Sequence, residues 1–561
     1  MPAGKRVRFV VLGLFLCLGI LIRVLFLRDF PYPFGHPDSS QYLATVADML
    51  EGRPFVPNEI RVNGAYAFFS YFVLKLLGHQ SWNIILVQSV LGALTGILAF
   101  LVVDELTHDW RFGAAALLLV SIRLRGLFYE HILLAETVYD FLGVLFCWVC
   151  VRVYLKPTLL RFCLLSAVTV ALVFARAQGW VSVAAEAMLI GVLWRRRNIS
   201  WKTAASFIPV ALLPLWFAVH AYVGLNRKHH QFSGLSAAGN YNLFWVATSR
   251  YLDFHSDRHR ELKQGLEPCI RDANQNHADD LAWGTPGPIC APAIRSITER
   301  MQSNWQVSDR QLGELSREAI LAHPMEVAYR FLWNVGDFLF VRRTVFRTAD
   351  LDPLLFESNH ARLRIDAAKA AATRSMDPLA FGQPVPAQHA DGPFQTVIGF
   401  LKPFVWNPVV FVLLAFSIFV MVCNRNDEIE VLLILVLIWA GHVGLTLFAV
   451  NALYDRYYLF PEALAVILIA AGLCSFARLG WRAKKWNLFS FAAAVSLCLA
   501  IFFLSRAVLT RLVPMLDSPV AGLSASNAAL YQSTVLSVVL CSVFSLGALR
   551  FVRRRSTLLR E

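Results

Sequence analysis

Apolar residues in this chain fall in long runs that are bounded by charged residues, and not in the short alternations of a soluble core. A helix needs about 20 apolar residues to cross a bilayer, and runs of that length recur along the chain. They predict membrane-spanning helices at residues 8–27, 82–103, 112–128, 134–154, 158–175, 179–194, 204–223, 405–424, 429–450, 458–477, 486–507 and 531–551. We therefore expect an all-α polytopic membrane protein with about twelve transmembrane helices.

Two stretches are too polar to lie in a membrane. Residues 28–81 follow the first helix, and within them 39–51 and 65–77 have helical periodicity but are too short to span, so we expect two helices lying in the interface. Residues 224–404 follow the seventh helix and form the second loop. This divides the chain into an N-terminal transmembrane catalytic module (1–223), a large extracytoplasmic loop (224–404) and a C-terminal transmembrane bundle (405–561).

Composition supports the membrane assignment. The 561 residues are 57% hydrophobic and only 16% charged, and the mean hydropathy is +0.53. A net charge of +14 would suggest nucleic acid for a soluble protein, but here the basic clusters lie where helices leave the membrane. The positive-inside rule accounts for them, with both termini in the cytoplasm and both polar loops outside. We expect an integral protein of the cell (inner) membrane that contacts membrane lipids and binds no nucleic acid.

The sequence contains no motif of soluble catalysis. The chain has no phosphate-binding glycine-rich loop followed by lysine, no nucleophile elbow and no HExxH. His131, His229 and His230 have no spacing that indicates a metal site, so a divalent metal is possible without being indicated and no cofactor is predicted. Cys269 and Cys290 both lie in the large outer loop, where the compartment allows a disulfide bond between them.

Charged residues at the outer ends of the predicted helices are the candidates for function, because a charge at membrane depth is costly. Asp38 follows the first helix, although an acid before a helix can also be only an N-cap. Glu136 belongs to a dense group of charges over 123–136, which an internal salt-bridge network would explain in part. Arg61, Arg176 and Arg456 lie at the outer face against the positive-inside trend, where an anionic lipid phosphate would supply a partner.

Short motifs in a fixed order resemble those of the GT-C membrane glycosyltransferases, specifically the bacterial relatives of protein O-mannosyltransferases and of the lipid A aminoarabinose transferase. The resemblance covers most of the chain. An Asp and a Tyr follow the first helix, an R-x-P-G-Y-P-x-F-like segment comes next, and a Y-x-x-x-L-L-x-E-like start opens the fourth helix. An RxQG turn and the RYxxPxxP-like opening of a late helix follow. The residues that carry these motifs are Asp38, Tyr42, Arg61, Gly64, Tyr66, Phe68, Tyr129, Glu136, Arg176, Gly179, Asn226, Gly239, Asn242, Leu243, 315–335, Arg456, Tyr457 and Pro461. The chain departs from the pattern at Ser39, Asn63 and Ala67, which affects the donor sugar and the subfamily.

The resemblance implies transfer of a sugar from a polyprenyl-phosphate donor to an acceptor hydroxyl on the extracytoplasmic face, with inversion at the anomeric carbon. It implies that Asp38 is the catalytic base and that Glu136 orients it or the substrate. Arg61, Arg176 and Arg456 would bind the donor phosphate. The remaining substrate contacts would come from Tyr42, Tyr66, His131, Asn242 and Tyr457. The expected partners are this donor and a lipid, glycan or protein acceptor.

Two other classes of protein fit parts of the pattern. A lipid-linked glycan flippase or transporter would also place arginines at the outer face, but it would favour internal symmetry, and no repeat is evident in the sequence. An O-antigen ligase or polymerase is likewise polytopic with a large outer loop, but such a protein depends on Arg and His within that loop.

Overall fold

The computed structural model describes residues 3–29, 39–56, 64–254, 257–276, 304–328, 331, 407–424, 429–449 and 458–483. Among these residues the regular structure is helical and no strand occurs, which confirms the predicted all-α class. Seven described helices are long and apolar enough to cross a membrane. They belong to α1 (Ala3–Asp29), α4 (Ser81–Thr107), α7 (Glu136–Leu155), α9 (Trp180–Arg195), α10 (Trp201–His230), α19 (Ile429–Ala449) and α20 (Leu459–Ala483). The chain is an integral membrane protein.

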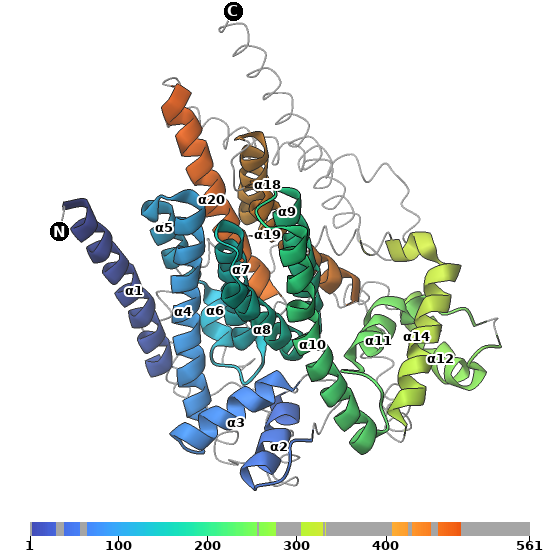
Figure 1. The fold of residues 1–561 in the computed structure, drawn as a ribbon. Helices are drawn as coiled ribbons and strands as arrows, with labels where there is room; N and C mark the ends of the chain where they lie inside the picture. The colour runs from blue at the N-terminus through green and yellow to red at the C-terminus, as the bar shows by residue number, and fades with distance from the viewer. Residues whose placement is uncertain are drawn as a thin grey trace, which may run out of the picture.

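The long helices run side by side in a bundle, and two short helices lie across one end of it (Figure 1). These are α2 (Ser39–Leu50) and α3 (Ala65–Leu77), which match the two interfacial helices predicted in the first loop. We call the end of the bundle that carries α2 and α3 the first-loop end. The N-terminus of α1 points to the opposite end (Figure 1).

Most predicted spans agree with a helix within a few residues, but the span at 112–128 does not. It is divided into α5 (Trp110–Ser121) and α6 (Leu124–Tyr129), with a break at Ile122 and Arg123. The break coincides with Arg123, whose Nε donates to the Val120 carbonyl at 3.2 Å. The predicted spans at 486–507 and 531–551 lie outside the described residues, as does much of 224–404.

Close packing around α4 depends on glycines. A Cβ at Gly96 would lie 2.4 Å from Ser121 Oγ on α5, and one at Gly113 of α5 would lie 2.8 Å from the Phe100 ring on α4. Small residues let membrane helices approach closely. Association of the helices then depends on van der Waals packing, because lipid offers little hydrophobic drive between them. These glycines bring α5 against α4, and α1 and α7 also contact α4. Further along the bundle, α8 (Leu159–Ala175) and α18 (Asn407–Asn424) complete the described helices of the core.

A small subdomain follows α10, which has 30 residues and contains Pro209 and Pro214. It consists of α11 (Ala238–Asn242), a π-helix (Leu243–Thr248), α12 (Arg260–Asn276) and α14 (Trp305–Ala322). Its apolar core is formed by Phe244, Leu252, Leu266, Ile270, Leu312 and Leu315. We call it the loop subdomain. The buried ammonium of Lys263 pairs with Glu318 and stabilises its interior.

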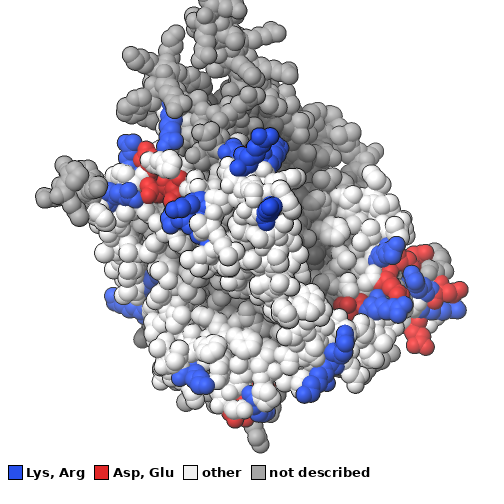
Figure 2. All heavy atoms as spheres, in the orientation of Figure 1, with Lys and Arg blue, Asp and Glu red and all other residues white. Residues whose placement is uncertain are grey.

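On the face shown in Figure 2, charged side chains gather at the end opposite α2 and α3 and over the loop subdomain, and a few more lie at the first-loop end. The broad area between them is mostly uncharged (Figure 2). Ion pairs at the opposite end join Arg8 to Asp104 at 2.7 Å and Arg152 to Glu105 at 2.9 Å. This separation of charged and apolar surface is what a protein embedded in a bilayer requires.

Candidate active site

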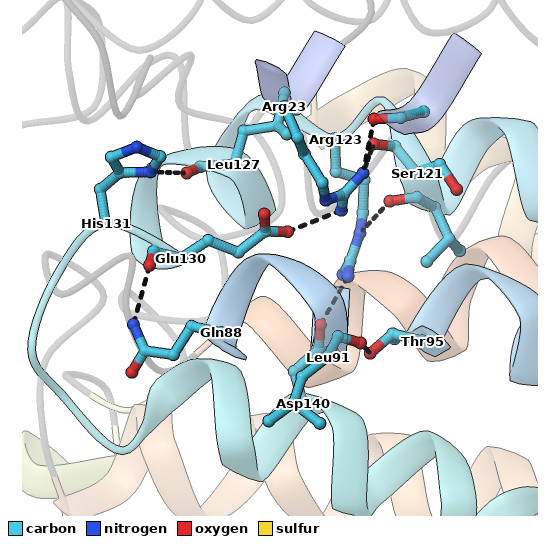
Figure 3. A network of polar contacts seen from close by, with 12 residues as sticks. Arg23, Gln88, Leu91, Thr95, Ser121, Arg123, Leu127, Glu130, His131 and Asp140 are labelled. Carbon is cyan, nitrogen blue, oxygen red and sulfur yellow. Dashed lines mark hydrogen bonds and ion pairs between the residues drawn. The ribbon is translucent and has the colours of Figure 1, made fainter. Parts of the chain in front are cut away.

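Four arginine–carboxylate pairs lie in or beside the stretch that connects α5 to α7. The pairs are Arg23–Glu130, Arg123–Asp140, Arg125–Glu462 and Arg176–Glu136. The dense group of charges predicted at 123–136 is therefore largely an internal network, and Figure 3 shows part of it. Three of these pairs place the arginine deep in the protein, and one places it nearer to the surface.

The Arg23–Glu130 pair is buried between α1 and the segment after α6. The guanidinium donates to Glu130 Oε1 at 2.6 Å and to the carbonyls of Gly19 and Ser121 at 3.1 and 3.0 Å (Figure 3). The carboxylate occupies the space that a side chain at position 92 would fill, because a Cβ on Gly92 would lie 1.9 Å from Glu130 Oε1. Both side chains are buried, so this pair leaves no exposed charge for a ligand.

Gln88 of α4 orders the loop that leads to α7. Its Nε2 donates to the carbonyls of Glu130 and Ile132 at 2.8 and 2.9 Å. Its Oε1 accepts from the Tyr66 hydroxyl at 2.8 Å. Gln88 therefore links α3 of the first loop to the backbone that precedes Glu136.

Arg123 and Arg125 connect this region to α20, which lies more than 300 residues later in the chain. Arg123 donates to Asp140 Oδ2 at 2.6 Å and to the Leu459 carbonyl at 2.7 Å. Arg125 Nη1 lies 3.5 Å from Glu462 Oε2. Both arginines are buried, so these contacts hold the start of α20 against α7 and the segment that precedes it.

The fourth pair differs from the others in position and exposure. Arg176 Nη1 lies 2.5 Å from Glu136 Oε1, and the side chains are 13% and 2% exposed. Arg176 is thus the most exposed of the four paired arginines. Glu136 begins α7, and Arg176 lies between the end of α8 and the short 3-10 helix at Ala177–Gly179. The pair therefore joins two helix ends.

Two tyrosines of the first loop belong to the same region. The rings of Tyr42 on α2 and Tyr66 on α3 meet edge to face with centroids 5.0 Å apart. Burial raises the pKa of Tyr66 well above its usual value, and the nearby Tyr42 and Glu136 act in the same direction. We call Tyr42, Tyr66, Glu136 and Arg176 the Glu136 cluster. It draws its side chains from α2, α3, α7 and the turn after α8, and each was predicted as a site residue.

The other predicted site residues are placed elsewhere or not described. His131 is buried, its ring meets Phe26 edge-on at 4.2 Å, and its Nδ1 donates to the Leu127 carbonyl at 3.3 Å. Burial lowers the pKa of His131 to about 3 and keeps it neutral. Asn242 ends α11 in the loop subdomain. Their roles as substrate contacts stay predictions, as do the roles of residues outside the described ranges, which are Asp38, Arg61, Arg456 and Tyr457.

Cys269 is disulfide-bonded in the loop subdomain. The predicted partner, Cys290, lies outside the described residues, so the pairing itself stays a prediction. Among the described residues, no group of three or more His, Cys, Asp or Glu side chains could hold a metal ion.

Three ion-pair partners in the network were not predicted from the sequence: Arg23, Asp140 and Glu462. Each is a charged residue within an apolar run, which is a signal in itself because such residues are costly in a membrane unless they are paired. Their partners lie 107, 17 and 337 positions away, and no local pattern identifies partners at such separations.

Comparisons with known proteins gave structural matches only. Neither the scan against family models nor the search of curated proteins found a match. Among solved structures, the chain is similar to the oligosaccharyltransferase of Archaeoglobus fulgidus in the apo form, with a TM-score of 0.37 and 13% identity over 96% of this chain and 56% of that one. The same enzyme tethered with an acceptor peptide containing the NVT sequon gives a TM-score of 0.36 and 12% identity, covering 94% and 55%. ArnT from Cupriavidus metallidurans bound to undecaprenyl phosphate gives 0.32 and 12%, covering 96% and 88%.

The chain spans about half the length of the oligosaccharyltransferase it matches. TM-scores this low carry no argument about activity, so the function proposed below rests on the residues of the chain.

Proposed function

We propose that the protein is a membrane glycosyltransferase that transfers a sugar from a polyprenyl-phosphate donor to an acceptor hydroxyl at the first-loop end of the bundle. The observation that carries this proposal is the Glu136 cluster. Four residues that separate motifs single out in the sequence come together at one place, with a partly exposed arginine beside a buried carboxylate. A cation and aromatic rings at the membrane boundary suit a ligand that combines a lipid phosphate with a sugar.

The reaction needs two kinds of group. The bond between the anomeric carbon and the phosphate oxygen breaks, and the acceptor oxygen forms a new bond to that carbon from the opposite face. The polyprenyl phosphate leaves as an anion, so it requires cations more than a proton donor. Arg176 supplies one cation, and Arg61 and Arg456 are proposed to supply others. The proton of the acceptor hydroxyl passes to a base, for which we propose Asp38.

The position of Asp38 in the chain supports its assignment. It directly precedes Ser39, the first residue of α2, and Ser39 is buried. Tyr42 of the Glu136 cluster lies on the same helix, one turn further on. Glu136, held by Arg176, is proposed to orient the base or a sugar hydroxyl. One base without a required nucleophile supports inversion at the anomeric carbon.

The test is sugar transfer by purified protein in nanodiscs from a panel of polyprenyl-phosphate pentoses and hexoses. Asp38→Asn keeps an oxygen that can cap α2 but cannot accept a proton, so turnover should fall by about 10²–10⁴-fold with little loss of folded protein. Asp48→Asn is the matched control, because Asp48 lies on the same helix and pairs with the exposed Arg53. Wild-type turnover in a folded Asp38→Asn variant would remove Asp38 from the mechanism.

A second comparison tests the phosphate site. Arg176→Ala should weaken donor binding, and Arg176→Lys should restore it only in part, because a point charge lacks the bidentate fork of arginine. Arg28→Ala is the control, since Arg28 is an exposed arginine near the end of α1. If the wild-type protein transfers no sugar but moves lipid-linked sugar across vesicle membranes, the transporter class is correct and the proposed function is wrong.

A further inference from the structure

Helix α19 contacts two helices that are connected to the Glu136–Arg176 pair. These are α7, which begins at Glu136, and α9, which follows Arg176. His442 of α19 and the hydroxyl of Tyr139 on α7 are 2.5 Å apart. His442 Nδ1 lies 2.8 Å from the Ile438 carbonyl, which can only accept. The proton of the neutral ring is therefore on Nδ1, Nε2 is the acceptor, and Tyr139 donates across the interface between α7 and α19.

The preceding residue of α19 faces a different helix. A Cβ on Gly441 would lie 2.9 Å from Cγ1 of Val181, in the first turn of α9. The absence of a side chain at Gly441 thus lets α9 approach α19 closely. Consecutive residues of α19 therefore contact α7 three positions after Glu136 and α9 five positions after Arg176.

These contacts lie near the helix ends whose relative position sets the distance between Glu136 and Arg176. The chain connects α7 to α8 at Lys156–Thr158, so that connection is a full helix length away from Glu136 and Arg176. At the first-loop end, the distance between the two residues depends on how the helices pack. The Tyr139 and His442 side chains are themselves fixed, since both are buried and the Phe460 ring meets each of them near a right angle.

We propose that Tyr139 and His442 are positioning residues that hold the Glu136 carboxylate in register with Arg176 for donor binding and turnover. The proposal rests on the function proposed above for the Glu136 cluster. Displacing a reacting or binding group by about 1 Å can cost about 10²-fold in rate. A tyrosine–histidine bond one turn inside Glu136 is placed to prevent such a displacement.

The experiment separates positioning from simple packing. Tyr139→Phe or His442→Leu alone leaves a buried polar group without its partner and should lower the midpoint of thermal unfolding. Replacing both partners by apolar groups restores the match, so the Tyr139→Phe/His442→Leu double variant should unfold near the wild-type temperature. We expect its turnover to stay about 10-fold or more below wild type, with recovery in His442→Gln, whose amide oxygen can accept from Tyr139. A double variant with both wild-type stability and wild-type turnover would overturn the proposal.

A matched control and a second readout complete the test. Ser417→Ala removes a buried hydrogen bond from α18 to the Ile469 carbonyl of α20, and it should leave turnover unchanged. Binding of undecaprenyl phosphate without sugar is measured in the same variants and in Arg176→Ala. If the wild type transfers no sugar but the double variant and Arg176→Ala both weaken this binding, the positioning role is supported and the transfer reaction is not. Weakened binding in Arg176→Ala alone, with wild-type affinity in the double variant, would refute the positioning role.

Discussion

The space occupied by the Glu130 carboxylate makes Gly92→Ala a sharp test of the buried network. A methyl group at position 92 would lie 1.9 Å from Glu130 Oε1 and 2.8 Å from Arg23 Nη2, so the carboxylate and the guanidinium cannot both keep their places. The substitution must break or stretch the 2.6 Å contact between them. At a helix position with free space around it, replacing glycine by alanine stabilises the folded protein.

The expected magnitude follows from two opposing effects. Alanine in place of glycine within a helix stabilises by about 1 kcal/mol, whereas breaking a buried ion pair costs about 3–5 kcal/mol. Gly92→Ala should therefore lower the free energy of unfolding by about 2–4 kcal/mol. Gly191→Ala on α9 is the control, because a Cβ added at Gly191 would meet no neighbouring atom within 4 Å. This substitution should leave the free energy of unfolding unchanged or raise it.

The measurement is unfolding by SDS titration in mixed micelles, followed by tryptophan fluorescence. Equal midpoints for Gly92→Ala and Gly191→Ala would refute the described packing of Glu130 against α4. A further check uses Glu130→Ala, which removes the carboxylate that Gly92→Ala displaces. In that background Gly92→Ala should lower the free energy of unfolding little further, because the effects of substitutions at contacting residues are not additive.

Three further predictions concern the loops. Reporter fusions at both termini and at Asp280 should place the termini in the cytoplasm and residue 280 outside; a cytoplasmic signal at Asp280 would contradict the predicted topology. If Cys269 pairs with Cys290, replacing Cys269 by serine should expose Cys290 to alkylation under non-reducing conditions, and an unreactive Cys290 would point to another partner for Cys269. Hydrogen bonds from Arg310 and His259 lower the pKa of Glu314 below 4.5, so their contribution to the stability of the loop subdomain should be complete above about pH 4.5 and lost as the pH falls through the lowered pKa. Hydrogen exchange in the subdomain should show that loss, and Glu314→Gln should flatten it.

The apolar runs predicted most of the bundle because a bilayer demands long uninterrupted helices. Spans at 134–154 and 158–175 correspond to α7 and α8 with ends that differ by no more than two residues. The predicted span at 112–128 was wrong as a single helix because Arg123 interrupts it. A hydropathy average combines Arg123 with its apolar neighbours and so hides it. The folded protein must provide hydrogen-bond acceptors for the guanidinium, which are the Val120 carbonyl and the Asp140 carboxylate.

The candidate site was predictable in part. Motif order singled out Tyr42, Tyr66, Glu136 and Arg176, and the structure brings them together. The pairing of Glu136 with Arg176 was not predicted, since an acid at the start of one helix and an arginine after the next can meet only through tertiary packing. His442 was missed for the same reason. It is a polar residue within an apolar run, and its partner Tyr139 lies 303 positions away.

The length of α10 has a consequence for the membrane around the protein. At about 1.5 Å per residue, its 30 residues extend about 45 Å, which exceeds a hydrocarbon core of about 30 Å by about 15 Å. Much of its surface is apolar and exposed, including Trp201, Leu213, Trp216 and Phe217. The helix also packs against α8 and α9, and its last residues, Arg227, Lys228, His229 and His230, are basic. The excess length therefore carries the chain out of the hydrocarbon core and holds the loop subdomain away from it.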